Sequence, residues 1–249
     1  MAESTRTTPA HADYGLDAPG IIRTLAIFGI LSLVAAFTWP RLTSAVPVMQ
    51  HIAIRPSLLW MGWALLAGSA LMIASSKWGK LRARDSLLNR FQLAGNETVL
   101  DVGCGHGLLL IGAAKRVPAG KAIGVDLWSQ VDQKDNSSAA TMANARTEGV
   151  ADRVDVRDGD MRALPLDDSS VDLVVSCLAI HNVSGSSERR KAIREIVRVL
   201  KPGGRVGIID IAHVGEYVDE FRKAGMSSVN THGIMPWIYP PTRVMTAIK

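Results

Sequence analysis

The stretch Val99-Leu-Asp-Val-Gly-Cys-Gly-His-Gly107 decides the fold of this chain. Its first four residues predict a buried strand. The three alternating glycines predict a tight turn, because glycine adopts positive φ angles and lets a ligand approach the backbone. The apolar run from Leu108 to Ala114 then predicts a helix whose first N–H groups point back at the turn. This order of elements indicates a nucleoside-containing ligand at the carboxyl end of a parallel strand.

Strand and helix signals alternate over the rest of this region. This alternation predicts βαβ units in an α/β fold, a Rossmann-like doubly wound parallel sheet with right-handed crossovers. The expected strands are 98–102, 122–126, 154–157, 171–176 and 205–210, followed by two short segments near 226–232 and 242–248. The expected helices are 107–117, 137–148, 188–200 and 214–224.

Two long apolar runs precede the α/β region. Ile21 to Trp39 contains one charged residue, Arg23, and Leu58 to Ser75 contains none. Each run is long enough to cross a hydrocarbon core of about 30 Å. A cleavable signal peptide is disfavoured because a polar tail precedes the first run and a second apolar run follows it. The sequence therefore predicts a flexible tail over residues 1–20 and two transmembrane helices, as a hairpin, over 21–76.

The distribution of basic residues predicts how the hairpin is oriented. The connecting loop carries only Arg41 and Arg55, whereas the segment after the second run carries Lys77, Lys80, Arg82 and Arg84. This bias predicts an integral membrane protein whose α/β domain faces the cytoplasm. Residues 77–96 are expected to form an amphipathic linker helix that contacts anionic lipid, and residues 97–249 to form the catalytic domain.

Composition narrows the classes of partner. The formal net charge is a modest +5, and no basic patch is interleaved with aromatic residues, so nucleic acid is not an expected partner. The two cysteines, Cys104 and Cys177, have no Cys or His at metal-ligand spacing. We therefore expect no metal site, and we interpret both cysteines as small residues beside the ligand cleft. The sequence does not indicate an oligomeric state.

The glycine spacing separates two families of nucleotide-binding folds. Dinucleotide enzymes have G-x-G-x-x-G, whereas this chain has G-x-G-x-G with Asp101 two residues ahead. The pattern resembles motif I of the class I S-adenosylmethionine-dependent methyltransferases. Further segments agree in order, including Asp158-Gly-Asp-Met161 and Lys201-Pro-Gly-Gly204. The resemblance covers about Leu87 to the C-terminus. It implies S-adenosyl-L-methionine as cofactor and a seven-stranded sheet with an antiparallel last strand.

The resemblance also assigns donor contacts to individual residues. Asp126 would accept hydrogen bonds from the ribose diol, since charge-assisted bonds of this kind are strong. Asp160 would accept one from the adenine amino group, with Met161 at the purine, although Asp-Gly is also an ordinary turn dipeptide. Asp101 is expected to organise the turn and the donor's ammonium group. The remaining cofactor-binding candidates are Gly103, Cys104, Gly105, Gly107, Leu127, Ser176 and Cys177.

The fourth strand runs into Cys177-Leu-Ala-Ile-His-Asn182, where the family presents residues to the acceptor. His181 is the catalytic candidate, because a histidine near neutrality can take a proton from a phenol or an activated carbon. The alternative is a histidine that hydrogen-bonds a neighbouring loop. His213 and Tyr217 are tentative acceptor contacts. Trp237 is a third, because the last hairpin turns at the cofactor face.

These features together predict the reaction and its setting. A membrane hairpin beside a minimal catalytic domain favours a lipophilic small-molecule substrate such as a quinone-like ring, phenol, terpenoid or lipid, with membrane lipid as a second partner. Methylation of a membrane-protein side chain and an inactive nucleotide-binding membrane scaffold are the alternatives. Methyl transfer needs mainly positioning of the two reactants, and a general base only where the acceptor must lose a proton.

Overall fold

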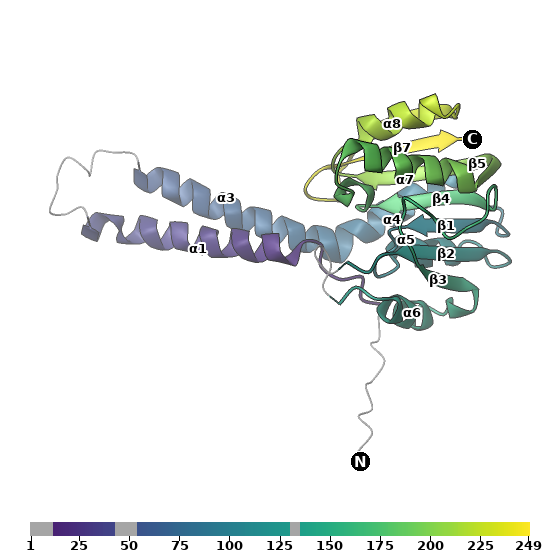
Figure 1. Cartoon of the computed structure of the whole chain (residues 1–249). Helices are drawn as coiled ribbons and strands as arrows, with labels where there is room; N and C mark the ends of the chain where they lie inside the picture. Colours follow the sequence, from purple (N-terminus) through teal and green to yellow (C-terminus); the bar gives the residue numbers. More distant parts are fainter. Residues whose placement is uncertain (1–11, 43–53, 130–134) are drawn as a thin grey trace, which may run out of the picture.

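The α/β domain is built on one sheet with the strand order β3-β2-β1-β4-β5-β7-β6. The computed structural model describes residues 12–42, 54–129 and 135–249 (Figure 1). The five strands from β3 to β5 pair in parallel, and β7 is antiparallel to both of its neighbours, as predicted. The strand bounds are β1 Thr98–Val102, β2 Lys121–Asp126, β3 Val154–Asp158, β4 Val171–Cys177, β5 Leu200–Asp210, β6 Ser227–Met235 and β7 Thr242–Ile248.

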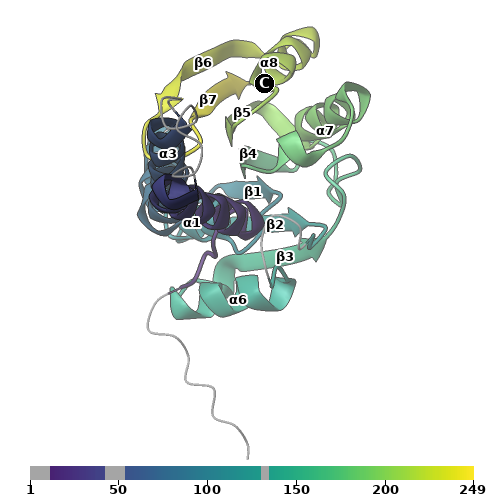
Figure 2. The ribbon, with the colours of Figure 1, turned by 90° about the vertical axis from the view of Figure 1, so that its left-hand side faces the viewer.

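Helices cover both faces of this sheet, which is why β1 and β4 are apolar on both sides. On one face, Leu87 and Leu109 belong to a core with Val99. On the other, Ile196 and Phe221 pack with Leu100, and Figure 2 shows α7 and α8 together on that side. The helices of the domain are α4 Lys80–Leu88, α5 Leu108–Ala114, α6 Ser138–Thr147, α7 Ser186–Val199 and α8 Val214–Lys223.

Two further helices form a hairpin that extends away from the domain (Figure 1). These are α1 Pro19–Leu42 and α3 Ile54–Ala74, and both are long and apolar enough to cross a membrane. Only 22% of the most apolar window of each helix is buried. The helices cross closely at Gly29 and Gly62, where an added β-carbon would lie 3.1 Å and 3.0 Å from the opposing glycine carbonyl oxygen. Small residues at such a crossing let two helix backbones approach.

The N-terminal segment differs from the flexible tail predicted over residues 1–20. Residues 1–11 lie outside the described residues, but Tyr14 is buried and α1 already begins at Pro19. The physical reason is the Lys80 ammonium, which binds the carbonyl oxygens of Tyr14 and Gly15 at 2.7 Å each. Residues 12–20 therefore belong to the folded part of the chain.

The linker predicted over residues 77–96 is not a separate helix. Helix α3 continues through a π-helical turn, Ser75–Gly79, directly into α4, and helical structure ends with the 3₁₀ turn Asn89–Phe91. The predicted boundary at 76–77 therefore lies inside a continuous helical path. Strand β5 also begins earlier than predicted, at Leu200, and its pairing with β4 is irregular where Lys201-Pro-Gly-Gly204 passes.

The π-helical turn is where the β6–β7 loop, residues 236–241, meets the hairpin. An added β-carbon at Gly79 would lie 1.8 Å from the carbonyl oxygen of Trp237. Tyr239 donates its backbone N–H to Ser75 Oγ at 2.9 Å. Gly79 thus lets the loop backbone lie directly on the helix, and the hydroxyl of Ser75 holds the loop there through its hydrogen bond.

We expect Gly79→Ala to destabilise the protein by about 1–3 kcal/mol, because the new methyl group must displace backbone atoms of the loop. Thermal unfolding of the full chain in detergent measures this. Gly215→Ala is the matched control, since an added β-carbon there has nothing within 4 Å. An unfolding temperature for Gly79→Ala equal to that of Gly215→Ala would contradict the close packing of the loop.

Candidate active site

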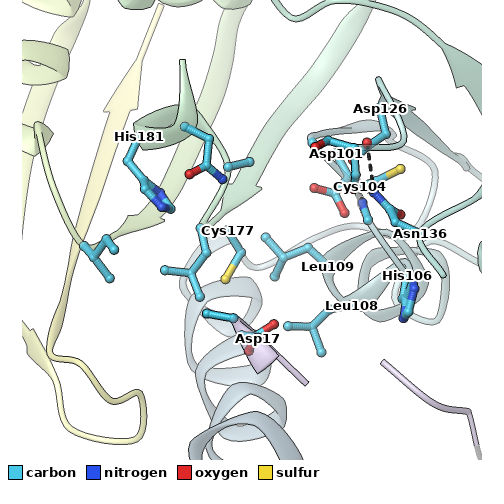
Figure 3. Close-up of a pocket in the computed structure, with 18 of the residues that line it drawn as sticks. Asp17, Asp101, Cys104, His106, Leu108, Leu109, Asp126, Asn136, Cys177 and His181 are labelled. Atoms are coloured by element: carbon cyan, nitrogen blue, oxygen red, sulfur yellow. Dashed lines mark hydrogen bonds between the residues drawn. The ribbon is translucent and has the colours of Figure 1, made fainter. Parts of the chain in front are cut away.

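A cavity of about 510 Å³ opens at the carboxyl ends of β1, β2 and β4. This is the edge at which parallel α/β sheets bind ligands. Figure 3 shows Asp101, Cys104 and Asp126 on one side of the cavity and His181 on the other, with Cys177 and Leu109 between them. The cavity is also lined by residues outside the sheet: Tyr14, Asp17, Ala18, Met72, Ser75, Ser76, Lys80, Ile238, Tyr239 and Pro240.

The glycine turn has the geometry predicted from its sequence. Gly103, Gly105 and Gly107 have φ angles of 71°, 49° and 86°, a region that residues with a β-carbon rarely adopt. An added β-carbon at Gly103 would also lie 2.3 Å from the β-carbon of Ala179. Gly103 and Gly105 line the cavity, whereas Gly107 lies behind it as the residue before α5.

Asp126 fixes this turn from the end of β2. Its Oδ2 accepts the N–H of Gly105 at 2.8 Å, and its Oδ1 accepts the N–H of Trp128 at 2.7 Å. Asn136 donates to the same Oδ1 at 3.3 Å. The carboxylate therefore lies at the cavity with a fixed orientation, as a group that binds a diol requires.

Asp101 lies beneath the turn and is 2% exposed. Its Oδ2 accepts the N–H of Leu110 at 2.8 Å. Burial, with a smaller contribution from the charge of Asp126, raises the pKa of Asp101 to about 8. Desolvation disfavours the ionised carboxyl, and a nearby cation favours it. A positively charged ligand group at this position would thus favour ionisation of Asp101.

Asp160 and Met161 line the cavity beyond the end of β3. Both oxygens of Asp160 accept from the guanidinium of Arg162, which lowers the pKa of Asp160. The backbone N–H of Arg162 also donates to Oδ1 at 2.8 Å. Leu127, which is 63% exposed, completes this end of the cavity. These positions are compatible with a purine site that has an ionised carboxylate at its edge.

His181 lies at the opposite end of the cavity and contacts a buried carboxylate. Its Nδ1 is 2.6 Å from Oδ1 of Asp210, a close contact without hydrogen-bond alignment. Its backbone N–H donates to Asp210 Oδ2 at 3.1 Å, and the Tyr217 hydroxyl donates to the same oxygen at 3.1 Å. Asp210 is fully buried, so this carboxylate orients the imidazole.

The two remaining candidates for binding the methyl donor, Ser176 and Cys177, end β4 and lie differently. Cys177 lines the cavity, but Ser176 is buried and donates its hydroxyl to the carbonyl oxygen of Val102 at 2.8 Å. Burial raises the pKa values of the Cys177 and Cys104 thiols. Both thiols are therefore protonated at neutral pH and are poor nucleophiles. No cluster of metal-ligating side chains is present among the described residues.

The three tentative acceptor contacts do not line the cavity. His213 contacts Glu216, and Trp237 lies under the guanidinium of Arg82, 5.5 Å from the ring centre. Tyr217 is fully buried behind Asp210. The reason is that α8 begins at Val214, so its first turn directs Tyr217 into the core rather than toward the cavity.

The sequence reasoning missed Asp210 and the residues from outside the sheet, above all Asp17 and Lys80. For Asp210 a signal existed, because it ends an apolar strand as Asp126 does. Nothing in the local sequence connects Asp17 or Lys80 with the glycine turn, because tertiary packing brings them there.

The comparisons with known proteins concern the α/β part of the chain. Residues 100–208 match the family profile described as "Methyltransferase domain". The matched segment includes the glycine turn, Asp126, Asp160 and His181. The match describes this segment as a methyltransferase domain, and the fold and the match together support the S-adenosylmethionine-dependent class, which uses S-adenosyl-L-methionine as its cofactor.

Two curated relatives illustrate how far the similarity extends. The chain is 35% identical over 130 residues to an arsenite methyltransferase of Halobacterium salinarum. The aligned region covers 51% of this chain and 30% of the relative. It is also 31% identical over 130 residues to a demethylmenaquinone methyltransferase of Lactobacillus johnsonii. That aligned region covers 51% of this chain and 49% of the relative. The chain thus spans less than half the length of either relative.

A solved structure shows the same fold. The crystal structure of a SAM-dependent methyltransferase from Aquifex aeolicus matches with a TM-score of 0.55 at 21% identity, covering 73% of this chain and 97% of that one.

We expect Asp126→Asn to weaken binding of S-adenosylhomocysteine by about ten- to hundredfold, the worth of a charged hydrogen bond. The asparagine has one acceptor oxygen in place of two, so it cannot hold the turn and the ligand equally well. Calorimetric titration measures the change. Asp158→Asn, at the end of the adjacent strand and outside the cavity, is the control and should bind as the wild type does. Equal affinities for the wild type, Asp126→Asn and Asp158→Asn would show that Asp126 does not bind the methyl donor.

Proposed function

We propose that this protein is a membrane-anchored S-adenosylmethionine-dependent methyltransferase that methylates a lipophilic small molecule with a quinone-, phenol-, terpenoid- or lipid-like head. The observation that carries the proposal is that two parts of the chain share the cavity. Asp101 and Asp126, the candidate residues for the methyl donor, lie at one end, and Met72 of the apolar hairpin contributes to the wall of the cavity. The similarity to a demethylmenaquinone methyltransferase supports an acceptor of this chemical type.

The position of the β6–β7 loop supports a membrane at the mouth of the cavity. The Tyr239 hydroxyl lies 3.8 Å from the place where a β-carbon of Gly68 would be, so the loop contacts α3 within its apolar span. Tyr239 is 40% exposed, and Trp78 on the same helical path is 64% exposed. Tyrosine and tryptophan side chains favour the membrane–water interface. We infer that the loop lies at the bilayer surface, on the cytoplasmic side.

The hairpin itself fits a bilayer better than a protein core. Both helices are exposed over most of their apolar windows. Large exposed side chains along them include Phe28, Phe37 and Trp60. An exposed apolar surface of this size is costly in water and favourable in lipid. The basic residues that follow the second helix support a cytoplasmic catalytic domain.

The residues of the cavity then have separate tasks in an in-line methyl transfer. When bound, S-adenosyl-L-methionine supplies an electrophilic methyl group on its sulfonium. Asp126 and Met161 hold the adenosine end, and the glycine turn lets the donor approach the backbone. His181, beside Asp210, would accept the proton of an acceptor hydroxyl while the methyl group passes from the donor sulfur to the oxygen or to an activated carbon, so that the methyl–sulfur bond breaks and S-adenosylhomocysteine leaves. The apolar side chains of Leu109 and Ile238 exclude water from the reacting groups.

A radiolabelled-donor assay tests the acceptor class. Membranes that contain the overexpressed protein are incubated with methyl-labelled S-adenosylmethionine and extracted with organic solvent. We expect the label in a chromatographically resolved lipid-soluble product, because the cavity adjoins the hairpin. Asp126→Asn membranes are the control. Label that stays with protein after lipid extraction would point instead to a membrane-protein side chain, and no enzyme-dependent label would indicate an inactive scaffold.

We expect His181→Asn to lower kcat by about 10²- to 10⁴-fold, the usual contribution of a general base. Asparagine keeps a polar group beside Asp210 but cannot take up a proton. Affinity for S-adenosylhomocysteine should not change, since His181 lies at the other end of the cavity. His213→Asn, outside the cavity, should keep full activity. Unchanged turnover in His181→Asn would show that the acceptor needs no base at this position.

A further inference from the structure

We propose that residues 13–18, here called the N-terminal strap, form the wall of the donor site at its amino-acid end, and that Lys80 is the positioning residue that holds them. The inference rests on the proposed function, because it requires that the cavity bind the methyl donor. The strap precedes the segment that matches the methyltransferase family by more than eighty residues, so the family similarity says nothing about it.

Lys80 makes the central contacts of the strap. Its side chain is 5% exposed, and its ammonium donates to the carbonyl oxygens of Tyr14 and Gly15 at 2.7 Å each and to Asp17 Oδ1 at 3.3 Å. A lysine ammonium has three N–H donors. All three therefore have acceptors within the strap, which is the condition under which a charge can be buried.

Two other side chains fix the strap at its ends. Asn144 of α6 accepts the N–H of Asp13 at 3.0 Å and donates to the carbonyl oxygens of Asp13 and His106 at 2.8 and 3.0 Å. Ser76 accepts the N–H of Asp17 at 3.0 Å and contacts its Oδ2 at 3.2 Å. The strap is thus tied to the glycine turn at one end and to the π-helical turn at the other.

The strap packs directly on the glycine turn. An added β-carbon at Gly15 would lie 2.9 Å from Nδ1 of His106, so the strap backbone covers this ring. His106 is 8% exposed, and neither ring nitrogen has a hydrogen-bond partner among the described residues. Displacing the strap would therefore expose the outer side of the turn that must bind the donor.

The strap reaches the cavity at the end opposite the adenosine residues. Asp17 and Ala18 line the cavity, and Figure 3 shows Asp17 beside Leu108 and below Cys177, away from Asp126. A donor whose ribose is held at Asp126 has to extend across the glycine turn toward the end of β4. Its amino-acid portion then lies between the turn and the strap, and its positive sulfonium lies on the side where Asp17 contributes a carboxylate.

The strap also connects the donor site with the hairpin. Residue 18 is followed directly by Pro19, the first residue of α1, and Ser76 and Lys80 follow the last turn of α3. Both ends of the hairpin therefore hold the strap in place. The hairpin therefore supports the wall of the donor site, in addition to anchoring the domain at the membrane.

Two ligands distinguish this role from a general effect on folding. S-adenosylhomocysteine occupies both the adenosine and the amino-acid regions, and adenosine occupies the first alone. For the full-length protein in detergent, we expect Lys80→Met to weaken S-adenosylhomocysteine binding by about tenfold or more, because it removes the ammonium that binds the carbonyl oxygens of Tyr14 and Gly15. Adenosine affinity should change by less than about twofold. Calorimetric titration with each ligand gives the ratio of the dissociation constants of the variant and the wild type.

Lys77→Met is the matched control. Lys77 lies one turn earlier on the same helical path and also contacts the strap, but its side chain is 47% exposed and its ion pair with Asp13 is 3.6 Å long. Exposed ion pairs of this kind contribute little, so both affinities should stay within about twofold of wild type. Ser76→Ala, which removes strap contacts without burying an unpaired charge, should show the same ligand selectivity as Lys80→Met and decides the matter if Lys80→Met does not fold.

Three outcomes would overturn the inference. An unchanged affinity for S-adenosylhomocysteine in the folded variants would show that the strap does not contact the donor. An equal loss for adenosine would assign Lys80 a general structural role. Failure of the wild-type protein to bind S-adenosylhomocysteine would reject the proposed function itself, and the role of the strap with it.

Discussion

The carboxylate of Asp126 is the contact on which the architecture of the site depends. It accepts one backbone N–H from the glycine turn after β1 and another from the loop after β2, so it fixes the ends of two adjacent strands. Gly105 donates its N–H at a φ of 49°, a backbone conformation that glycine adopts readily, and an added β-carbon at Gly103 would lie 2.3 Å from the β-carbon of Ala179. The same carboxylate lines the cavity, and for this reason we propose that one residue both holds the turn and binds the ligand.

A second constraint is the continuous helical path from α3 through the π-helical turn into α4. Single π-helical turns inside helices frequently mark functional sites, and here the turn receives the β6–β7 loop at Gly79 and the strap at Ser76. Apolar hairpin, strap and strand ends thus share one cavity. This arrangement places the acceptor end of the site beside the surface that we propose lies in the bilayer.

Two groups of buried polar side chains lie at the cavity or directly behind its wall. Asp210 interacts with His181 and Tyr217, and Lys80 with the strap carbonyls and Asp17. Burying a charge is unfavourable unless it is paired and hydrogen-bonded. Each of these groups meets that condition, and each lies within or directly behind the cavity wall. Such paired groups hold side chains in one orientation, which is what a transfer reaction that depends on positioning needs.

The sequence by itself determined the sheet, its helices and the glycine turn with its strand-end aspartates. These follow from local signals: alternating strand and helix patterns, positive-φ glycines, and aspartates at strand ends such as Asp126. Tertiary structure alone decided the rest of the site. Tyr217 went into the core because of where α8 begins, and residues 12–18 became part of the cavity because Lys80, more than sixty positions later, binds their carbonyl oxygens. Contacts between distant residues depend on packing in three dimensions, and no periodicity or motif within either segment encodes them.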